Sequence, residues 1–356
     1  MAFSRVLVWG FSNNRAGTET VIYNYAKNLP NVAFDFLCYS DPLNYSDLFT
    51  PDANNRYFVI PIKIKHPFAY TYALKKFMKE HGQEYSVLWC NINDVSNIDV
   101  LKYAKKYGIK RRITHIHTSQ MANVFITKVF SRLNYKKCLN LATDRWACSE
   151  SAGHFLYGDL PFRVIPNAID AKQRCFDQNK REAIRKQWNI QNEFVIGTVG
   201  RLADPKNQEF LIRLLPRLLV RNPATVIMLV GDGIFKEKLS DLARSLNVGG
   251  RVIFAGSQTD IQAYLSSFDV FAFPSLYEGL SLSLLEAQFN GLPCIISEGV
   301  GEESVISLNT KIIALDDVSG WVDSLLHGTR KNDALIKEKA VLYDLANIGA
   351  IASSMF

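Results

Sequence analysis

Two glutamates, Glu278 and Glu286, have the residue type and spacing that point most directly to chemistry. Between them the sequence predicts a turn at Gly279 and then an apolar helix. A carboxylate accepts two hydrogen bonds from vicinal hydroxyls, such as those of a ribose or a hexose. The free N–H groups of Leu282 and Ser283 at the helix start favour an anion nearby. This segment therefore predicts a site for a sugar-bearing diphosphate, and the simpler alternative is one helix-capping and one solvated glutamate.

Other turns carry groups that suit an anion. Arg201 and Lys206 lie in one loop and could offset the charge of a leaving diphosphate, although two cations in a loop also occur on ordinary surfaces. Gly231 begins a Gly-Asp-Gly turn that either lets the backbone approach a bound group or is only a turn. Gly17 opens a predicted helix whose N–H groups suit an anion, but it lacks the spacing of a dinucleotide or Walker motif.

Two histidines, His115 and His117, close a strand-like run. Their spacing of two places both imidazoles on one face of a strand. A metal half-site, a pair of structural histidines and groups that line a cleft are three alternatives. No third ligand is evident in the sequence, so the metal site is the weakest of them.

The elements that must position these residues alternate between short apolar runs and helical patterns, which is typical of parallel α/β folds. We expect strands at residues 5–9, 32–39, 57–61, 86–91, 112–115, 145–149 and 163–166, and at 194–199, 225–230, 252–255, 270–273 and 293–296. The pattern loosens between about 170 and 192, so the predicted domains are 1–168 and 169–336. Ligands of open α/β sheets bind beyond the carboxyl ends of the strands, where the turns described above lie.

Composition is that of an ordinary folded protein of 356 residues, with 48% hydrophobic and 21% charged residues. Its six cysteines form no Cys-x-x-Cys pair, so we expect reduced thiols and a cytoplasmic location. No leader is visible and no apolar run reaches about 18 residues, so no membrane-spanning segment is predicted.

The net charge of +7 is unevenly distributed: residues 1–168 carry 21 Lys and Arg against 12 Asp and Glu. Part of this surplus lies in a predicted helix at 122–141 that mixes apolar and basic residues. Such a helix either lies on an anionic membrane or faces the core with a solvated cationic side. No recognition motif accompanies the charge, so a nucleic-acid partner is not expected.

Several ordered motifs resemble one known family. Glu278 and Glu286 match a Glu-x7-Glu element, and residues 164–170 read Val-Ile-Pro-Asn-Ala-Ile-Asp. Gly200-Arg201 with Lys206-Asn207, and Gly231-Asp232-Gly233, follow the same family pattern. Together they resemble the family 4 retaining glycosyltransferases, in particular bacterial members that build capsular, exopolysaccharide or lipopolysaccharide chains.

The resemblance implies a GT-B fold, in which two Rossmann-like, doubly wound domains face a cleft. Residues 169–336 would hold the donor and 1–168 the acceptor, with a last helix at about 337–356 packing back on the first domain. By this resemblance Arg201 and Lys206 bind the donor diphosphate, Glu286 the ribose and Glu278 the transferred sugar. The remaining predicted donor contacts are Gly17, Gly231, Gly279, Leu280, Leu282 and Ser283.

The same resemblance places His115 and His117 in the acceptor cleft, as candidate catalytic groups. Ala16 and Ala168 stand where the family usually has glycine.

The activity that this resemblance implies is retaining transfer of a hexose or N-acetylhexosamine from a nucleotide-diphosphate sugar, with UDP the expected nucleotide. The expected acceptor is a polyprenyl-diphosphate-linked glycan at the inner face of the cytoplasmic membrane, which the protein contacts peripherally. The sequence has no Asp-x-Asp, so neither a metal nor another cofactor is expected. Alternatives are a sugar-nucleotide epimerase of GT-B architecture, a phosphorylase, and a nucleotide-sugar binding protein without catalysis.

Overall fold

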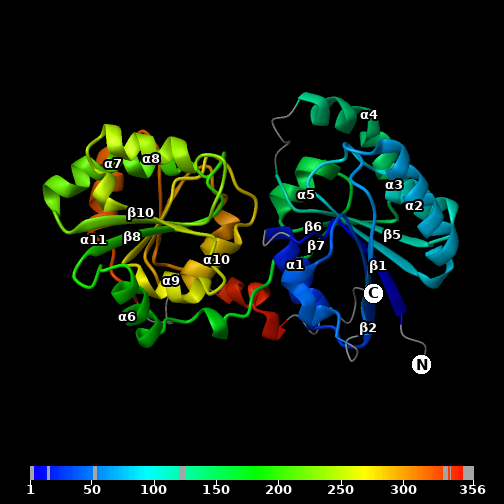
Figure 1. Ribbon diagram of the computed structural model, residues 1–356, viewed down its shortest axis with the longest axis horizontal. Helices are drawn as coiled ribbons and strands as arrows, with labels where there is room; N and C mark the ends of the chain where they lie inside the picture. The colour runs from blue at the N-terminus through cyan, green and yellow to red at the C-terminus, as the bar shows by residue number, and fades with distance from the viewer. Residues whose placement is uncertain are drawn as a thin grey trace. The chain divides into compact units, whose positions relative to one another are not determined.

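The computed structural model describes residues 4–13, 17–50, 54–119, 125–331, 336 and 338–347. The chain divides into two compact units (Figure 1). Unit 1 contains Met1–Ile169 and Asp344–Phe356, and unit 2 contains Asp170–Tyr343. The division falls one residue after the boundary expected from the sequence.

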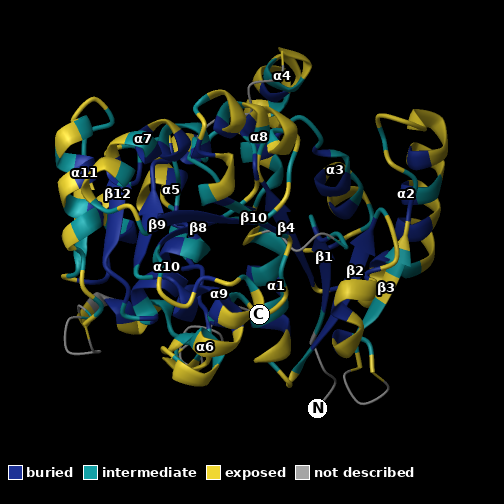
Figure 2. Cartoon of the chain, turned by 60° about the vertical axis from the view of Figure 1, so that its left-hand side comes forward, coloured by how far each residue is buried: buried dark blue, intermediate teal, exposed yellow. Residues whose placement is uncertain are grey.

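Unit 1 is built on a seven-stranded parallel sheet with the order β3-β2-β1-β4-β5-β6-β7. Its strands are β1 Ser4–Trp9, β2 Val32–Cys38, β3 Arg56–Val59, β4 Val87–Ile92, β5 Arg111–Ile116, β6 Asp144–Ala147 and β7 Arg163–Val164. Its α-helices are α1 Gly17–Lys27, α2 Pro67–His81, α3 Asp99–Lys106, α4 Phe125–Leu141 and α5 Glu150–Tyr157. Every residue of β4 is buried, as expected for a strand with both faces covered (Figure 2).

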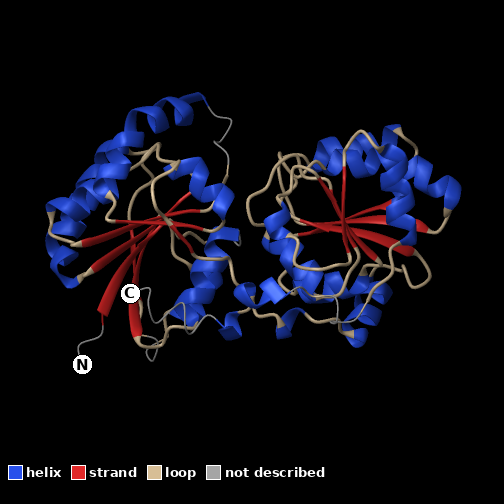
Figure 3. Ribbon diagram, turned by 180° about the vertical axis from the view of Figure 1, so that it is seen from behind, coloured by secondary structure: helices blue, strands red, loops and turns tan. Residues whose placement is uncertain are grey.

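Unit 2 repeats this plan, with helices around a central sheet (Figure 3). Its six parallel strands have the order β10-β9-β8-β11-β12-β13. Its strands are β8 Phe194–Val199, β9 Thr225–Val230, β10 Val252–Gly256, β11 Val270–Phe273, β12 Cys294–Ser297 and β13 Thr310–Ile313. Its α-helices are α6 Gln178–Gln187, α7 Gln208–Arg221, α8 Lys236–Ser245, α9 Ile261–Ser267, α10 Leu282–Phe289 and α11 Val318–His327.

Short 3-10 turns complete the described secondary structure. They are Leu43–Leu48, Gly82–Glu84, Lys172–Arg174, Gly249–Arg251, Glu302–Ser304, Glu338–Tyr343 and Leu345–Asn347.

The core of unit 2 has one apolar layer on each face of the sheet. Along β8, Val195 and Val199 belong to one layer, and Ile196 belongs to the other. This alternation follows from the period of two along a strand. Because both faces are covered, the strand reads in sequence as a continuous apolar run.

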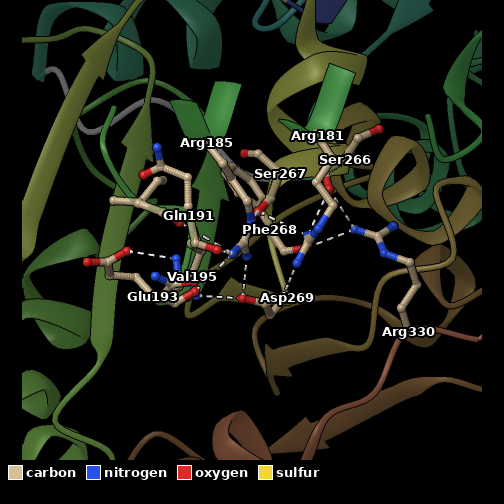
Figure 4. Close-up of polar contacts among 12 residues, drawn as sticks. Arg181, Arg185, Gln191, Glu193, Val195, Ser266, Ser267, Phe268, Asp269 and Arg330 are labelled. Carbon is tan, nitrogen blue, oxygen red and sulfur yellow. Dashed lines mark hydrogen bonds and ion pairs between the residues drawn. The ribbon is translucent and has the colours of Figure 1, made fainter. Parts of the chain in front are cut away.

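The amino end of β11 is fixed by a cluster of charged groups around Asp269 (Figure 4). Arg181 and Arg185 of α6 each donate an Nη2–H to this carboxylate at 2.6 Å. The N–H of Val195 donates to it at 2.7 Å, and Arg330 donates to the carbonyl of Phe268 at 2.9 Å. The cluster holds the amino end of β11 against α6 and β8. The position of its carboxyl end, from which the following loop begins, is fixed as a result.

The predicted parallel α/β class is confirmed, and the predicted strands agree with the structure within about two residues at either end. The strand β13 was missed. It begins with the polar pair Thr310-Lys311 and its two central residues are exposed, so it lacks a fully buried apolar run. Five of the six cysteines are buried and Cys175 is exposed, and all six are thiols rather than halves of a disulfide.

The helix expected at about 337–356 is wrong for the part that the structure describes. Glu338–Tyr343 and Leu345–Asn347 form 3-10 turns instead. Between them Asp344 forms a parallel bridge with Ile169, and the N–H of Leu345 donates to the Ile169 carbonyl at 2.9 Å. Pairing with an extended segment takes the backbone groups that an α-helix would need. Residues 348–356 lie outside the described part of the chain.

Candidate functional site

The direction of strand addition in unit 2 reverses between β8 and β11, and ligands of open α/β sheets bind at such a point. The loops that follow these two strands are joined there by hydrogen bonds. The N–H of Leu276 donates to the carbonyl of Pro205 at 2.9 Å, and the hydroxyl oxygen of Ser275 lies 3.1 Å from the same carbonyl oxygen. Asn207 donates its side-chain N–H to Pro274 at 3.1 Å. The loops therefore form one rigid platform at the carboxyl edge of the sheet.

Two predicted site residues meet on this platform. Lys206 Nζ lies 2.7 Å from Glu278 Oε1, and the hydroxyl of Ser275 donates to that oxygen at 2.9 Å. Lys206 also lies over the ring of Phe273, with 4.6 Å between Nζ and the ring centroid. The N–H of Glu278 donates to Gly299 at 2.9 Å, which holds the glutamate in place. A fixed cation beside a fixed carboxylate can hold a phosphate and a hydroxyl at adjacent positions.

Glu286 is buried in α10, and its partner is a residue that the sequence did not predict. Arg174 donates its Nε–H to Glu286 Oε1 at 2.8 Å. Burial raises the pKa of Glu286, and the charge and hydrogen bond of Arg174 partly oppose this rise. Arg174 lies in the charged segment before α6. The only sequence signal for its pairing with Glu286 is that it is basic, because a buried carboxylate needs a cation beside it.

The start of α10 lies between the two glutamates. Ser281 is its N-cap residue, but its side chain makes no capping hydrogen bond to a backbone N–H of the first turn. Its hydroxyl instead lies 3.1 Å from that of Ser283. The predicted donors Leu282 and Ser283 are in the first turn and half-buried, where backbone N–H groups have no partner inside the helix.

The other predicted donor-site residues of unit 2 differ in exposure. Arg201 is exposed, Gly279 is half-buried and Leu280 is buried. Gly231 has a φ of +133°, and a Cβ atom there would lie 2.1 Å from the carbonyl oxygen of Gly200. This glycine is therefore required by the close approach of the β9 and β8 loops, whether or not it also contacts a ligand.

The predicted histidine pair lies at the carboxyl edge of the sheet in unit 1. The rings of His115 and His117 are 4.1 Å apart between centroids, so the two imidazoles share one face as expected. His115 is fully buried, and Trp89 donates its indole N–H to His115 Nδ1 at 3.3 Å. His117 is half-buried, and its Nε2 lies 2.9 Å from Asn91 Oδ1. Of the two imidazoles, His117 is the less buried.

Both imidazoles are held neutral. Burial lowers the pKa of His117 to about 3, and a hydrogen bond with the side chain of Asn167 partly opposes this shift. Burial, and then the neighbouring imidazole, lower the pKa of His115 well below its usual value. The described residues bring no group of three His, Cys, Asp or Glu side chains together here or elsewhere. A neutral imidazole has one nitrogen that donates and one that accepts a hydrogen bond.

Asn91 links this histidine to the first strand and was not predicted. Its side-chain N–H donates to the carbonyl of Trp9 at 3.3 Å. Gly10 follows with a φ of +89°, and a Cβ there would lie 2.2 Å from the Asn91 carbonyl oxygen. Gly17, the predicted anion contact, opens α1 and is exposed, while Ala16 lies outside the described residues. The ends of β1, β4 and β5 thus form one polar edge.

Comparison with known proteins agrees with this fold. The family model "Glycosyl transferases group 1" matches residues 180–334. EpsF of Bacillus subtilis (strain 168), described as a glycosyltransferase, is 30% identical over 363 residues, which cover 95% of this chain and 92% of EpsF. The UDP-Gal:alpha-D-GlcNAc-diphosphoundecaprenol alpha-1,3-galactosyltransferase of Escherichia coli is 33% identical over 184 residues, which cover 49% of this chain and 47% of that enzyme.

Solved structures show the same architecture. Anabaena HepE, in complex with UDP and glucose, has a TM-score of 0.74 and 20% identity, covering 99% of this chain and 95% of HepE. WaaG, a glycosyltransferase involved in lipopolysaccharide biosynthesis, has a TM-score of 0.68 and 15% identity, covering 98% and 95%. The chain is therefore a glycosyltransferase with the GT-B fold. It belongs to the group 1 glycosyl transferase family, as the resemblance to family 4 predicted.

Proposed function

We propose that this protein transfers a hexose or N-acetylhexosamine, with retention, from a UDP-sugar to a lipid-linked saccharide during assembly of a bacterial surface polysaccharide. The observation that carries the proposal is the Lys206 and Glu278 ion pair on the platform of unit 2, with Glu286 buried in the adjacent helix. This set offers one cation for a diphosphate and two carboxylates for pairs of hydroxyls. A nucleotide-sugar contains both a diphosphate and such hydroxyl pairs.

We assign to the residues the roles that the resemblance to family 4 implies. Glu286 accepts hydrogen bonds from the ribose, and Glu278 accepts them from the transferred sugar. Arg201, Lys206 and the first N–H groups of α10 offset the charge that develops on the diphosphate as it leaves, without a metal. In unit 1, His117 hydrogen-bonds a hydroxyl of the acceptor. Among the described residues no side chain is placed as a covalent nucleophile, so we propose front-face attack assisted by the leaving phosphate.

The comparisons support the choice of donor and acceptor classes. HepE was solved with UDP and glucose, and the Escherichia coli relative is named for transfer of galactose from UDP-Gal to a diphosphoundecaprenol-linked sugar. EpsF, which is similar over nearly the whole chain, is described as a glycosyltransferase.

A panel of UDP- and GDP-sugars offered with a short polyprenyl-diphosphate-linked saccharide tests the proposal. We expect nucleotide release that depends on both donor and acceptor, and a product whose anomeric configuration by NMR matches that of the donor. Glu278→Gln should abolish this release. UDP-sugar turnover without acceptor would support an epimerase, and UDP binding without any product would support a non-catalytic binding protein. Inversion at the anomeric carbon would refute the proposed mechanism.

A further inference from the structure

The helix α4 of unit 1 turns its apolar side away from the protein. At 100° per residue, Ser131 and Cys138 mark one side of the helix, and both are buried. Five large apolar residues cluster on the opposite side and are exposed: Phe125, Ile126, Val129, Phe130 and Leu133. Phe125 is 79% exposed and Leu133 is 65% exposed. A surface helix normally buries such a stripe, so this orientation is the reverse of the usual one. In Figure 2 much of α4 has the colour of exposed residues.

Polar contacts hold α4 in this orientation. Asn134 donates its side-chain N–H to the carbonyl of Ser96 at 2.9 Å, and Asn134 is half-buried. The inward side of the helix is thus lined by small and polar side chains rather than by the phenylalanines. The core-facing alternative that the sequence left open for this helix is therefore wrong.

Positive charge surrounds the apolar stripe. The helix contains four basic residues and no acidic residue: Lys128, Arg132, Lys136 and Lys137. Its C-terminal end and α3 form a hollow of about 270 Å³, which is lined by Lys102, Lys105, Lys137, Asn140 and Leu141. Lys102 is paired with Asp99 at 3.0 Å, whereas Lys105 and Lys137 make no ion pair within the described part of the chain. Unpaired ammonium groups around a hollow suit a phosphate.

We propose that α4 docks on an anionic phospholipid bilayer, with the apolar stripe in the headgroup and acyl boundary and a lipid phosphate in the lysine hollow. The helix then lies in the plane of the interface, where apolar burial and attraction to anionic lipid act together. None of the described helices is long and apolar enough to cross a bilayer, so the attachment is to one surface. This inference goes beyond the proposed function and does not rest on it.

Other occupants fit the surface less well. A second copy of the chain in a two-fold interface would oppose this helix to itself, and its four cations would then repel one another. RNA would satisfy the lysines, but phosphate contacts leave five exposed apolar side chains in water. An anionic lipid surface satisfies both the charge and the apolar area.

Co-sedimentation of the full-length protein with vesicles tests this inference without measuring sugar transfer. We expect binding to vesicles of equimolar phosphatidylcholine and phosphatidylglycerol, and much weaker binding to phosphatidylcholine alone. Removing both phenylalanines, as Phe125→Ser with Phe130→Ser, should weaken binding on the order of a hundredfold. Removing two charges, as Lys105→Gln with Lys137→Gln, should weaken it by about twenty-fivefold, and only for the anionic vesicles.

A matched variant controls for the loss of exposed apolar surface. Val220→Ser with Leu308→Ser removes two exposed apolar side chains of unit 2 and should leave vesicle binding unchanged. Far-UV circular dichroism and thermal melting should show that all variants remain folded, since every substituted position is on the surface. Vesicle binding that survives the phenylalanine substitutions overturns the inference. So does a dimer that these substitutions dissociate, or a protein that binds RNA but not vesicles.

Discussion

The two glutamates of the donor site should respond differently to the same small change. Glu286 is almost enclosed, with 10% of its side chain exposed, and Arg174 contacts only its Oε1 atom. The carboxylate therefore has lone pairs left for the ribose hydroxyls. Hydrogen bonds to a charged acceptor are about twice as strong as neutral ones, so Glu286→Gln should cost about 2 kcal/mol of UDP binding. This corresponds to a roughly thirtyfold increase in the Kd for UDP.

Glu278→Gln should instead leave the Kd for UDP unchanged or lower it. The change frees Lys206, which is 2.7 Å from the carboxylate, for the diphosphate. Turnover should nevertheless fall by at least about a hundredfold, because the contact to the transferred sugar is lost. The wild-type affinity should also fall as the pH drops, since the raised pKa of Glu286 lets it protonate earlier than an ordinary glutamate. Glu286→Gln should remove that pH dependence.

Isothermal titration calorimetry with UDP and a steady-state assay with the UDP-sugar separate the two effects. Glu182→Gln, at an exposed position of α6, is the matched control and should change neither quantity. The reasoning is refuted if Glu278→Gln weakens UDP binding by tenfold or more while Glu286→Gln leaves it unchanged.

Three further changes test how the sites are held in place. Gly231→Ala should destabilise the chain by about 3 kcal/mol through its positive φ and the contact with the neighbouring loop, whereas Gly250→Ala, with open space around it, should be neutral in urea denaturation. Asp269→Asn leaves Arg181 and Arg185 without their carboxylate and should lower the free energy of unfolding by about 3 kcal/mol in the same urea denaturation. An unchanged denaturation midpoint would show that the cluster around Asp269 does not stabilise unit 2. In the unfolded state His117 has an ordinary pKa of about 6.5, whereas in the folded state its pKa is about 3. The unfolded state therefore binds a proton first, and the free energy of unfolding falls as the pH drops from about 6.5 towards 3. By pH 5 the loss is about 2 kcal/mol. Hydrogen exchange of the backbone amides in β4 and β5, measured as a function of pH, should show this loss of stability in the wild type and in the control variant His66→Gln. The loss should be smaller in His117→Gln.

The fold class could be predicted because burial on both faces of a parallel sheet leaves a continuous apolar run in the sequence. The strand Phe194–Val199 agrees with its predicted bounds for this reason. The edge strand Thr310–Ile313 is exposed at its centre and half of its residues are polar, so it carries no continuous apolar run. The predicted C-terminal helix failed because a tertiary contact, the pairing of Asp344 with Ile169, outweighed local helix propensity.

The candidate site was predicted in part. The sequence alone determined the residue types: two carboxylates and a cation at strand ends and a helix start, because local patterning fixes where strands end and helices begin. Only the tertiary structure decided which side chains meet. The contacts of Lys206 with Glu278 and of Arg174 with Glu286 join residues 72 and 112 positions apart, and no local rule encodes such distances. The direction of the apolar stripe of α4 was decided in the same way, because periodicity shows that a helix has an apolar side but not what that side faces.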